Sequence, residues 1–278
     1  MRVHQVVAGV DGSLVSVRAL DRAADEAARR AAALRVLYAV PDLDEAGPIL
    51  AAAAARVRAR RPGLPVTTQA VRGSAVRALA HASEDAALTV VGTRGLRGFT
   101  GMLLGSVSLR LAAHAHGPLL VVRGDHRCGD GGEVLLGLAG EADTDAAAHA
   151  FQEAERRGAR LRVLHSWNQR HITPELPLLA PASAQTPAQA RLTRRAGAEE
   201  SVPRYTMARL QEQHPAVGID ARTVRTGPAH ALLEATRTAD VVVIGAHRRT
   251  HHVAPRLGPV AHTLLHRSHC PVLVVPSG

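Results

Sequence analysis

The sequence predicts an α/β protein made of two consecutive domains, each with a parallel sheet that carries helices on both faces. Within residues 5–122, short apolar runs alternate with helical patterns five times, which is typical of parallel strands joined by crossover helices. The length of 278 residues suits about two domains. From residue 134 onward the alternation begins again, which indicates an internal repeat.

Apolar runs in the first half predict strands at residues 5–10, 35–40, 65–71, 88–91 and 119–122. Between these runs, apolar residues recur at helical spacing. The pattern predicts helices over 19–28, over 48–60, from 74 to about 85, and from 106 to about 116. Proline and glycine mark the turns, as at Pro41, Pro62 and Gly117.

A glycine- and aspartate-rich interval at residues 124–132 predicts a linker between domains at 1–123 and 133–278. After it, apolar runs at 134–139, 161–165, 241–244 and 270–275 repeat those of the first half. Gly245 and Gly258 are also separated by the same interval as Gly92 and Gly105. The second half therefore repeats the strands and the glycine loop of the first.

The second half is longer between its second and third strands. Residues 167–204 contain five prolines and a low-complexity interval at 180–190, and a long loop of this kind is either disordered or functional. We expect a partly mobile surface segment that leads into a helix around 199–213. A lid over a ligand site is the alternative interpretation.

Composition limits the classes of partner. The chain has a net charge of +10 and no lysine, so the excess positive charge comes from arginine side chains. These arginines are spread along the predicted helices. With 2% aromatic residues, the chain lacks the stacking surface typical of single-strand nucleic-acid binders. No specific nucleic acid is therefore expected. The chain shows no signal peptide and no apolar run of membrane-spanning length, so we expect a cytoplasmic location and no membrane partner.

Reactive cysteine and metal chemistry receive little support. Cys128 and Cys270 cannot build a disulfide framework and neither lies in a CxxC motif. Histidines gather at 247–252 and at 262–269, but no HExxH or CxxC pattern orders them into a zinc site. We therefore predict no metal ligands.

The stretch from Val90 to Ser106 contains the strongest functional signal. An apolar strand leads into a loop with five glycines and then into a helix, and a helix N-terminus next to bare backbone is suited to binding anions. A P-loop is excluded because it requires lysine. A dinucleotide fingerprint is excluded because that loop follows the first strand of a sheet, whereas this loop follows the fourth.

The spacing of Gly92, Gly95, Gly105 and Ser106 resembles the motif of the ATP-binding subclass of the universal stress protein family. Two copies of the unit cover residues 5–123 and 133–276, so the resemblance is to tandem members. It implies two flavodoxin-like doubly wound domains, each with five parallel strands in the order 3-2-1-4-5. It also implies ATP as the ligand, alone or with Mg²⁺, and a stress-response or regulatory role.

Ligands of doubly wound sheets bind where the strand order reverses, which here lies between the first and fourth strands. The resemblance implies that the carboxylate of Asp11 contacts the nucleotide and that the backbone at Ala39 meets adenine. The glycines permit close backbone approach, and Ser106 and Val107 offer N–H groups to phosphate oxygens. The predicted cofactor-binding residues are Asp11, Ala39, Gly92, Gly95, Gly105, Ser106 and Val107.

Each of these residues also has a purely structural interpretation. Asp11 can cap the first helix, Gly92 can close a turn, and Ser106 can act as an ordinary N-cap; their combination at one strand edge favours the site. In the second half, Asp11 corresponds to Ala139, Gly95 to Arg248 and Ser106 to Pro259. We therefore expect that only the first domain binds ATP.

No nucleophile–base pair or pair of carboxylates accompanies the glycine loop, so we predict no catalytic residues. The leading hypothesis is an ATP-binding regulatory protein. A protein-interaction module without an essential ligand and a slow ATPase or phosphotransferase remain alternatives. Single-domain family members pair through the fifth strand, so we expect the two halves to pack as a pseudo-dimer through residues 119–122 and 272–275. A homodimer of the whole chain is a further possibility that the sequence leaves undecided.

Overall fold

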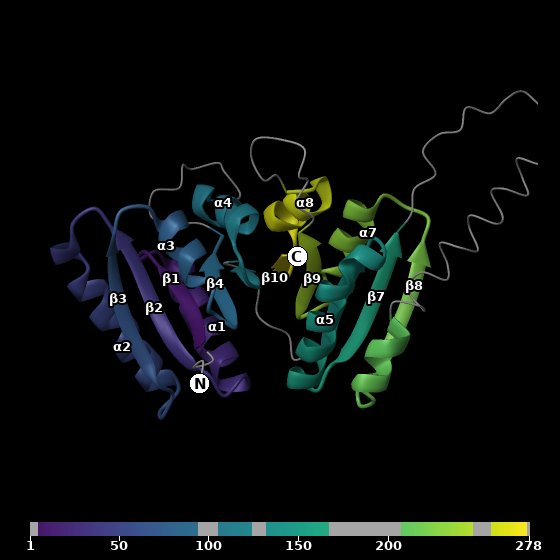
Figure 1. Cartoon of the computed structure of the whole chain (residues 1–278), viewed down its shortest axis with the longest axis horizontal. Coiled ribbons are helices and arrows are strands. Elements are labelled where there is room, and N and C mark those ends of the chain that lie inside the picture. The colour runs from purple at the N-terminus through teal and green to yellow at the C-terminus, as the bar shows by residue number, and fades with distance from the viewer. Residues whose placement is uncertain (1–4, 94–104, 124–131, 167–206, 247–256, 277–278) are drawn as a thin grey trace, which may run out of the picture.

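The computed structural model describes residues 5–93, 105–123, 132–166, 207–246 and 257–276, and it confirms a tandem α/β fold with a mainly parallel sheet (Figure 1). The first half contains β1 (Gln5–Val10), α1 (Leu14–Arg29), β2 (Ala33–Val40), α2 (Gly47–Arg60), β3 (Val66–Arg72), α3 (Ala75–Ala82), β4 (Leu88–Gly92), α4 (Ser106–His114) and β5 (Leu119–Val122). The second half contains β6 (Glu133–Leu138), α5 (Thr144–Arg157), β7 (Arg160–Ser166), β8 (Ile219–Val224), α7 (Pro228–Ala235), β9 (Val241–Ala246), α8 (Pro259–Arg267) and β10 (Val272–Pro276).

The ten strands form one continuous sheet in the order β3-β2-β1-β4-β5-β10-β9-β6-β7-β8. Strands within each half pair in parallel, as in the register of Val10 with Tyr38. The halves meet where β5 and β10 pair antiparallel, with Leu120 opposite Leu273. The two runs that were expected at the junction thus pair with each other, and they merge the two sheets into one.

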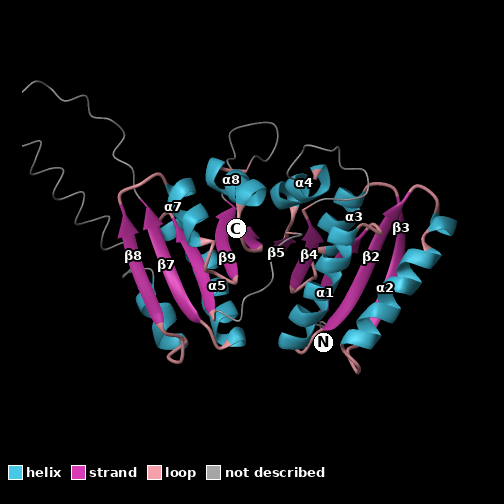
Figure 2. Cartoon of the chain, turned by 180° about the vertical axis from the view of Figure 1, so that it is seen from behind, coloured by secondary structure: helices cyan, strands magenta, loops and turns pink. Residues whose placement is uncertain are grey.

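Helices cover both faces of the sheet (Figure 2). One apolar core contains residues of α1, α2 and α5, and the other contains residues of α3, α4, α7 and α8. Successive residues of the central strands contribute to opposite cores: Val90 packs in the first and Val91 in the second. Burial on both faces explains why β5, with the sequence Leu-Leu-Val-Val, is a continuous apolar run instead of an alternating pattern.

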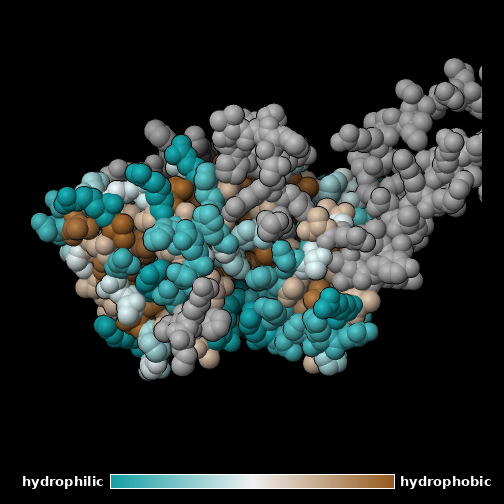
Figure 3. All heavy atoms as spheres, in the orientation of Figure 1, coloured by the Kyte–Doolittle hydropathy of each residue, from teal (hydrophilic) through white to brown (hydrophobic). Residues whose placement is uncertain are grey.

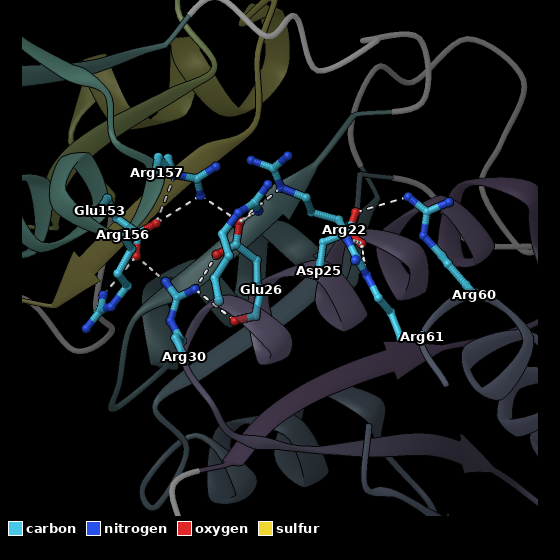
Figure 4. A network of polar contacts seen from close by, with 10 residues as sticks. Arg22, Asp25, Glu26, Arg30, Arg60, Arg61, Glu153, Arg156 and Arg157 are labelled. Carbon is cyan, nitrogen blue, oxygen red and sulfur yellow. Dashed lines mark hydrogen bonds and ion pairs between the residues drawn. The ribbon is translucent and has the colours of Figure 1, made fainter. Parts of the chain in front are cut away.

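The α1–α5 contact across the junction is charged. Glu26 and Glu153 are buried between the two helices, where Arg30 and Arg157 pair with them (Figure 4). On the opposite side of the sheet, Arg123 Nη1 donates a hydrogen bond to the carbonyl oxygen of His266, 2.5 Å away. Side chains of each half therefore contact the other half on both faces.

Two predicted helices end earlier in the structure than in the sequence analysis. Helix α3 ends at Ala82 because Ser83 Oγ donates a hydrogen bond to the Ala80 carbonyl (2.6 Å) and accepts one from the N–H of His116 (2.9 Å). Helix α4 ends at His114. Residues 207–213 are helical, at the end of the helix expected over 199–213. The expected surface segment at 167–204 and most of the expected linker lie outside the described residues.

Candidate functional site

A cavity of about 390 Å³ opens at the carboxyl ends of β1, β2 and β4, beside the N-terminus of α4. This is the edge where the strand order of the first half reverses, because β1 lies between β2 and β4. Six of the seven residues predicted from the sequence line this cavity: Asp11, Ala39, Gly92, Gly105, Ser106 and Val107. The seventh, Gly95, lies outside the described residues, as do Arg94 and Arg97.

The turn that carries Asp11 is held by reciprocal hydrogen bonds. Asp11 Oδ1 accepts the N–H of Ser13 at 3.0 Å, and Ser13 Oγ caps α1 by accepting the N–H of Ser16 at 3.1 Å. Ser16 Oγ donates to the Ser13 carbonyl at 2.8 Å and accepts the N–H of Asp11 at 3.3 Å. Ser13 is therefore the N-cap of α1, and Asp11 supports it by accepting its N–H, while the half-buried side chain of Asp11 also lines the cavity.

Gly92 is required for helix packing. A Cβ at this position would lie 2.8 Å from Val15 Cγ1 and 3.1 Å from the Val15 carbonyl oxygen. The absence of a side chain thus lets β4 approach the start of α1, which is a reason that the sequence analysis did not foresee. Ser108 Oγ then fixes the strand end by donating to the Gly92 carbonyl at 2.6 Å.

The N-terminus of α4 supplies donor groups to the cavity wall. Gly105 is the N-cap, with φ −74° and ψ 149°, and no side chain caps the helix. Its N–H donates to the Thr93 carbonyl at 2.5 Å, which joins the two ends of the loop between β4 and α4. Because the first N–H groups of an α-helix have no acceptor within the helix, Ser106 and Val107 can present donors to an anion in this cavity.

Several lining residues were missed by the sequence analysis. Tyr38 comes from β2, where the register places it beside Val10, and Glu45 comes from the turn before α2. Ser16 and Ser108 are buried serines on α1 and α4. The two serines were detectable as polar residues on helix faces that are otherwise apolar, whereas the positions of Tyr38 and Glu45 depend on tertiary structure.

The charges at the cavity are few. Among the described lining residues, Asp11 and Glu45 are acidic and no arginine lines the wall. The favourable electrostatic contribution to anion binding within this described part is the N-terminal dipole of α4, which carries about half a positive charge.

The corresponding positions of the second half differ. Ala139 follows β6 where Asp11 follows β1. Gly258 is the N-cap of α8, and Pro259 is the first residue of this helix, so the first turn has one N–H fewer than that of α4. Arg248 lies outside the described residues.

Metal and thiol chemistry gain no support from the described residues. Within them, no group of three or more His, Cys, Asp or Glu side chains is arranged to hold a metal ion. The rings of His262 and His266 lie 4.4 Å apart on α8, and burial, together with the charges of His262 and Arg123, lowers the pKa of His266. Burial raises the pKa of the Cys270 thiol to about 12, so this thiol is unreactive at neutral pH.

The surface of the molecule is mixed in polarity on the face that Figure 3 shows. Figure 3 shows hydrophilic and hydrophobic residues interspersed on one face of the molecule. Leu14, at the start of α1, is the most exposed large hydrophobic residue of the described part. None of the helices that the structure describes has the length and apolar character needed to cross a membrane.

Comparison with known proteins agrees with the fold. The model of the universal stress protein family matches residues 2–61, 43–123 and 133–276. A universal stress protein of Mycobacterium tuberculosis (strain H37Rv) is 30% identical, over 97% of this chain and 94% of its own length. One of Mycolicibacterium smegmatis is 36% identical, over 77% of this chain and 69% of its own length.

A solved structure that covers the whole chain shows the same fold. A universal stress protein from Archaeoglobus fulgidus superimposes with a TM-score of 0.69 at 17% identity and covers 100% of both chains. A shorter universal stress protein, solved in complex with cAMP, matches 44% of this chain and 98% of its own at 30% identity, with a TM-score of 0.37. Since the family model and full-length relatives cover nearly the entire sequence, this chain belongs to the universal stress protein family.

Proposed function

We propose that the chain is a stress-response protein that binds ATP, alone or with Mg²⁺, in the cavity of its first domain and acts in the cytoplasm as a regulatory protein. One observation carries the proposal: the residues selected by motif spacing at Gly92, Gly105 and Ser106 line the same cavity as Asp11 and Ala39. These residues lie in or directly beside three strands and a helix that are far apart in sequence. Their convergence supports a ligand site.

The cavity suits a nucleotide in size and in the distribution of its donor groups. Its volume of about 390 Å³ lies within the range of roughly 300–1,000 Å³ that is typical of small-molecule sites. Polar donors lie at one end, at the α4 N-terminus, and apolar walls such as Leu37 and Val40 lie on β2. This arrangement can accommodate an anionic group and an apolar ring at opposite ends of one ligand.

The proposed roles follow from these positions. The N–H groups of Ser106 and Val107 bind phosphate oxygens, assisted by the helix dipole. Asp11 accepts a hydrogen bond from a ribose hydroxyl or helps to hold Mg²⁺ on the phosphates. The backbone at Ala39 contacts the base. The second domain lacks the carboxylate of Asp11 and the hydroxyl of Ser106, so one ATP binds per chain.

Two measurements test this function. The nucleotide released by denaturing the purified protein is identified by mass spectrometry, and isothermal titration gives the affinity and stoichiometry for ATP, with cAMP and GTP as competitors. We expect one ATP site per chain and its loss in Asp11→Ala/Gly105→Val. A protein that carries no nucleotide and binds none would support the ligand-independent interaction module. Two equivalent sites would contradict the role given to the second domain.

A further inference from the structure

Two equivalent positions in the two domains carry residues of different charge. In the first domain, Ser16 Oγ accepts the N–H of Asp11, the residue after β1, at 3.3 Å. In the second domain, Asp143 Oδ2 accepts the N–H of Ala139, the residue after β6, at 2.6 Å. Both side chains are buried, with exposed fractions of 4% and 3%. The shared hydrogen bond identifies Asp143 as the counterpart of Ser16.

The acidic residue of this turn also occupies different positions in the two domains. The first domain has a carboxylate at Asp11 and a neutral hydroxyl at Ser16, and the second has a methyl group at Ala139 and a carboxylate at Asp143. Asp143 further accepts the N–H of Gly140 at 3.3 Å. Two backbone donors of the strand–helix turn in the second domain are therefore engaged by a negative charge of the protein itself.

A charge at the Ser16 position would act differently from that of Asp11. The side chain of Asp11 is half-buried and reaches solvent, whereas Ser16 lies in the cavity wall almost without exposure. Charges in such a poorly hydrated position are weakly screened. A carboxylate there would repel the phosphates of a ligand, while the neutral hydroxyl keeps the N–H of Asp11 bonded without adding charge.

We propose that this position, Ser16 in the first domain and Asp143 in the second, determines whether the crevice of each domain accepts a phosphate-bearing ligand. The inference rests on the proposed function of the first-domain cavity. It makes Ser16 a specificity-determining residue, and it gives a reason for the loss of nucleotide binding in the second domain that is separate from Pro259.

The test compares Ser16→Asp with Ser16→Asn in the full chain, because both can accept the N–H of Asp11 but only the first adds a charge. ATP and uncharged adenosine are titrated into each variant. We expect Ser16→Asp to weaken ATP binding at least about tenfold and adenosine binding less than about threefold. Ser16→Asn should keep the affinity for ATP within about threefold. Because this position is buried, added salt should change the difference in ATP affinity between the two variants only slightly.

Each outcome of these titrations leads to a different conclusion. Wild-type protein that fails to bind ATP overturns the proposed function itself. Wild-type protein that binds ATP, with Ser16→Asp binding it equally well, overturns only the role of Ser16. Equal weakening of ATP and adenosine in both variants assigns Ser16 to loop packing, which also overturns the inference. If Ser16→Asp unfolds, Asp11→Ala/Ser16→Asp, which carries the residue pair of the second domain, is compared with Asp11→Ala by the same titrations.

Discussion

Arg157 of α5 reaches across the domain junction and donates a hydrogen bond to Glu26 of α1, with 2.6 Å between Nη2 and Oε1. In return, Arg30 at the end of α1 pairs with Glu153 of α5. Each arginine also pairs with the glutamate of its own domain. Figure 4 shows the four side chains between the two helices. The junction on this face is thus a reciprocal, buried ion-pair network.

Removing one anion from this network should destabilise the protein strongly. Glu26→Gln leaves Arg30 and Arg157 buried with less negative charge, and breaking a buried ion pair costs about 3–5 kcal/mol. The free energy of unfolding in urea measures this effect. Asp21→Asn is the control, because Asp21 pairs with the half-exposed Arg56 and an exposed pair contributes about 0–1 kcal/mol. Equal losses in the two variants would contradict the prediction.

The same network predicts a loss of stability in acid. Burial alone would raise the pKa of Glu26, but the charges of Arg157, Arg30 and Arg22 outweigh it and lower the pKa from 4.5 to about 2. Because the folded-state pKa is the lower one, the stabilisation is complete above pH 4.5 and is lost as the pH falls from there toward 2. It amounts to about 3 kcal/mol.

Urea unfolding of wild type and Glu26→Gln between pH 7 and pH 2 measures this contribution. We expect the gap between their unfolding free energies to shrink as the pH falls below 4.5. A gap that stays constant over the whole range would show that the ionisation of Glu26 contributes nothing.

Gly105→Val should abolish ATP binding and leave the fold intact. The N-cap angles of Gly105, φ −74° and ψ 149°, are open to any residue, so the variant should keep its helical content and its unfolding temperature. Because Gly105 lines the cavity, we expect a valine side chain there to occupy space needed by the ligand. Gly258→Val is the matched control at the N-cap of α8, where a Cβ meets nothing within 4 Å. Isothermal titration measures the effect. If wild type and Gly105→Val bind ATP with the same affinity, this loop is not part of the ATP site.

Gly92→Ala should behave differently and lower stability. The new Cβ would lie 3.1 Å from the Val15 carbonyl oxygen, which is backbone and cannot rotate away, so we expect a loss of about 1–3 kcal/mol. Gly218→Ala serves as control because its Cβ meets nothing within 4 Å. Thermal unfolding followed by circular dichroism compares the variants. Unchanged stability of Gly92→Ala would show that α1 and β4 can separate without cost.

The two halves should bind each other when expressed as separate chains, 1–131 and 132–278. Their joining strands β5 and β10 are buried, with Leu120 and Leu273 only 1% and 2% exposed, and an open strand of this kind is an aggregation hazard. Light scattering after size-exclusion chromatography should show a one-to-one complex. Two stable monomers without mutual affinity would contradict a pseudo-dimer.

The sequence predicts the strands well because burial on both faces leaves an unbroken apolar run, as at residues 119–122. It also selects residues such as Asp11 and Gly105 that meet at one cavity. Their convergence follows from a general rule, since the carboxyl ends of parallel strands share one edge of a sheet.

The remaining features depend on contacts between residues far apart in the chain. The approach of Val15 to Gly92 gives this glycine a packing role that motif spacing cannot reveal. Glu26 and Glu153 lie at the apolar positions of their helices and are buried at the junction, where arginines of both domains pair with them. The match of Ser16 with Asp143 is likewise hidden, because Ser16 follows Asp11 by five residues whereas Asp143 follows Ala139 by four.

Because the two halves are covalently linked, a mutation in one half leaves the sequence of the other half unchanged. In a symmetric homodimer every substitution appears twice, so a residue lost from one crevice is lost from both, and each interface pair must remain complementary to its own copy. Here Arg30 and Arg157 keep a nearly symmetric contact, while Ala139 and Pro259 depart from Asp11 and Ser106 without altering the first domain. Joining two copies in one chain therefore allows their surfaces to specialise independently while the shared sheet is preserved.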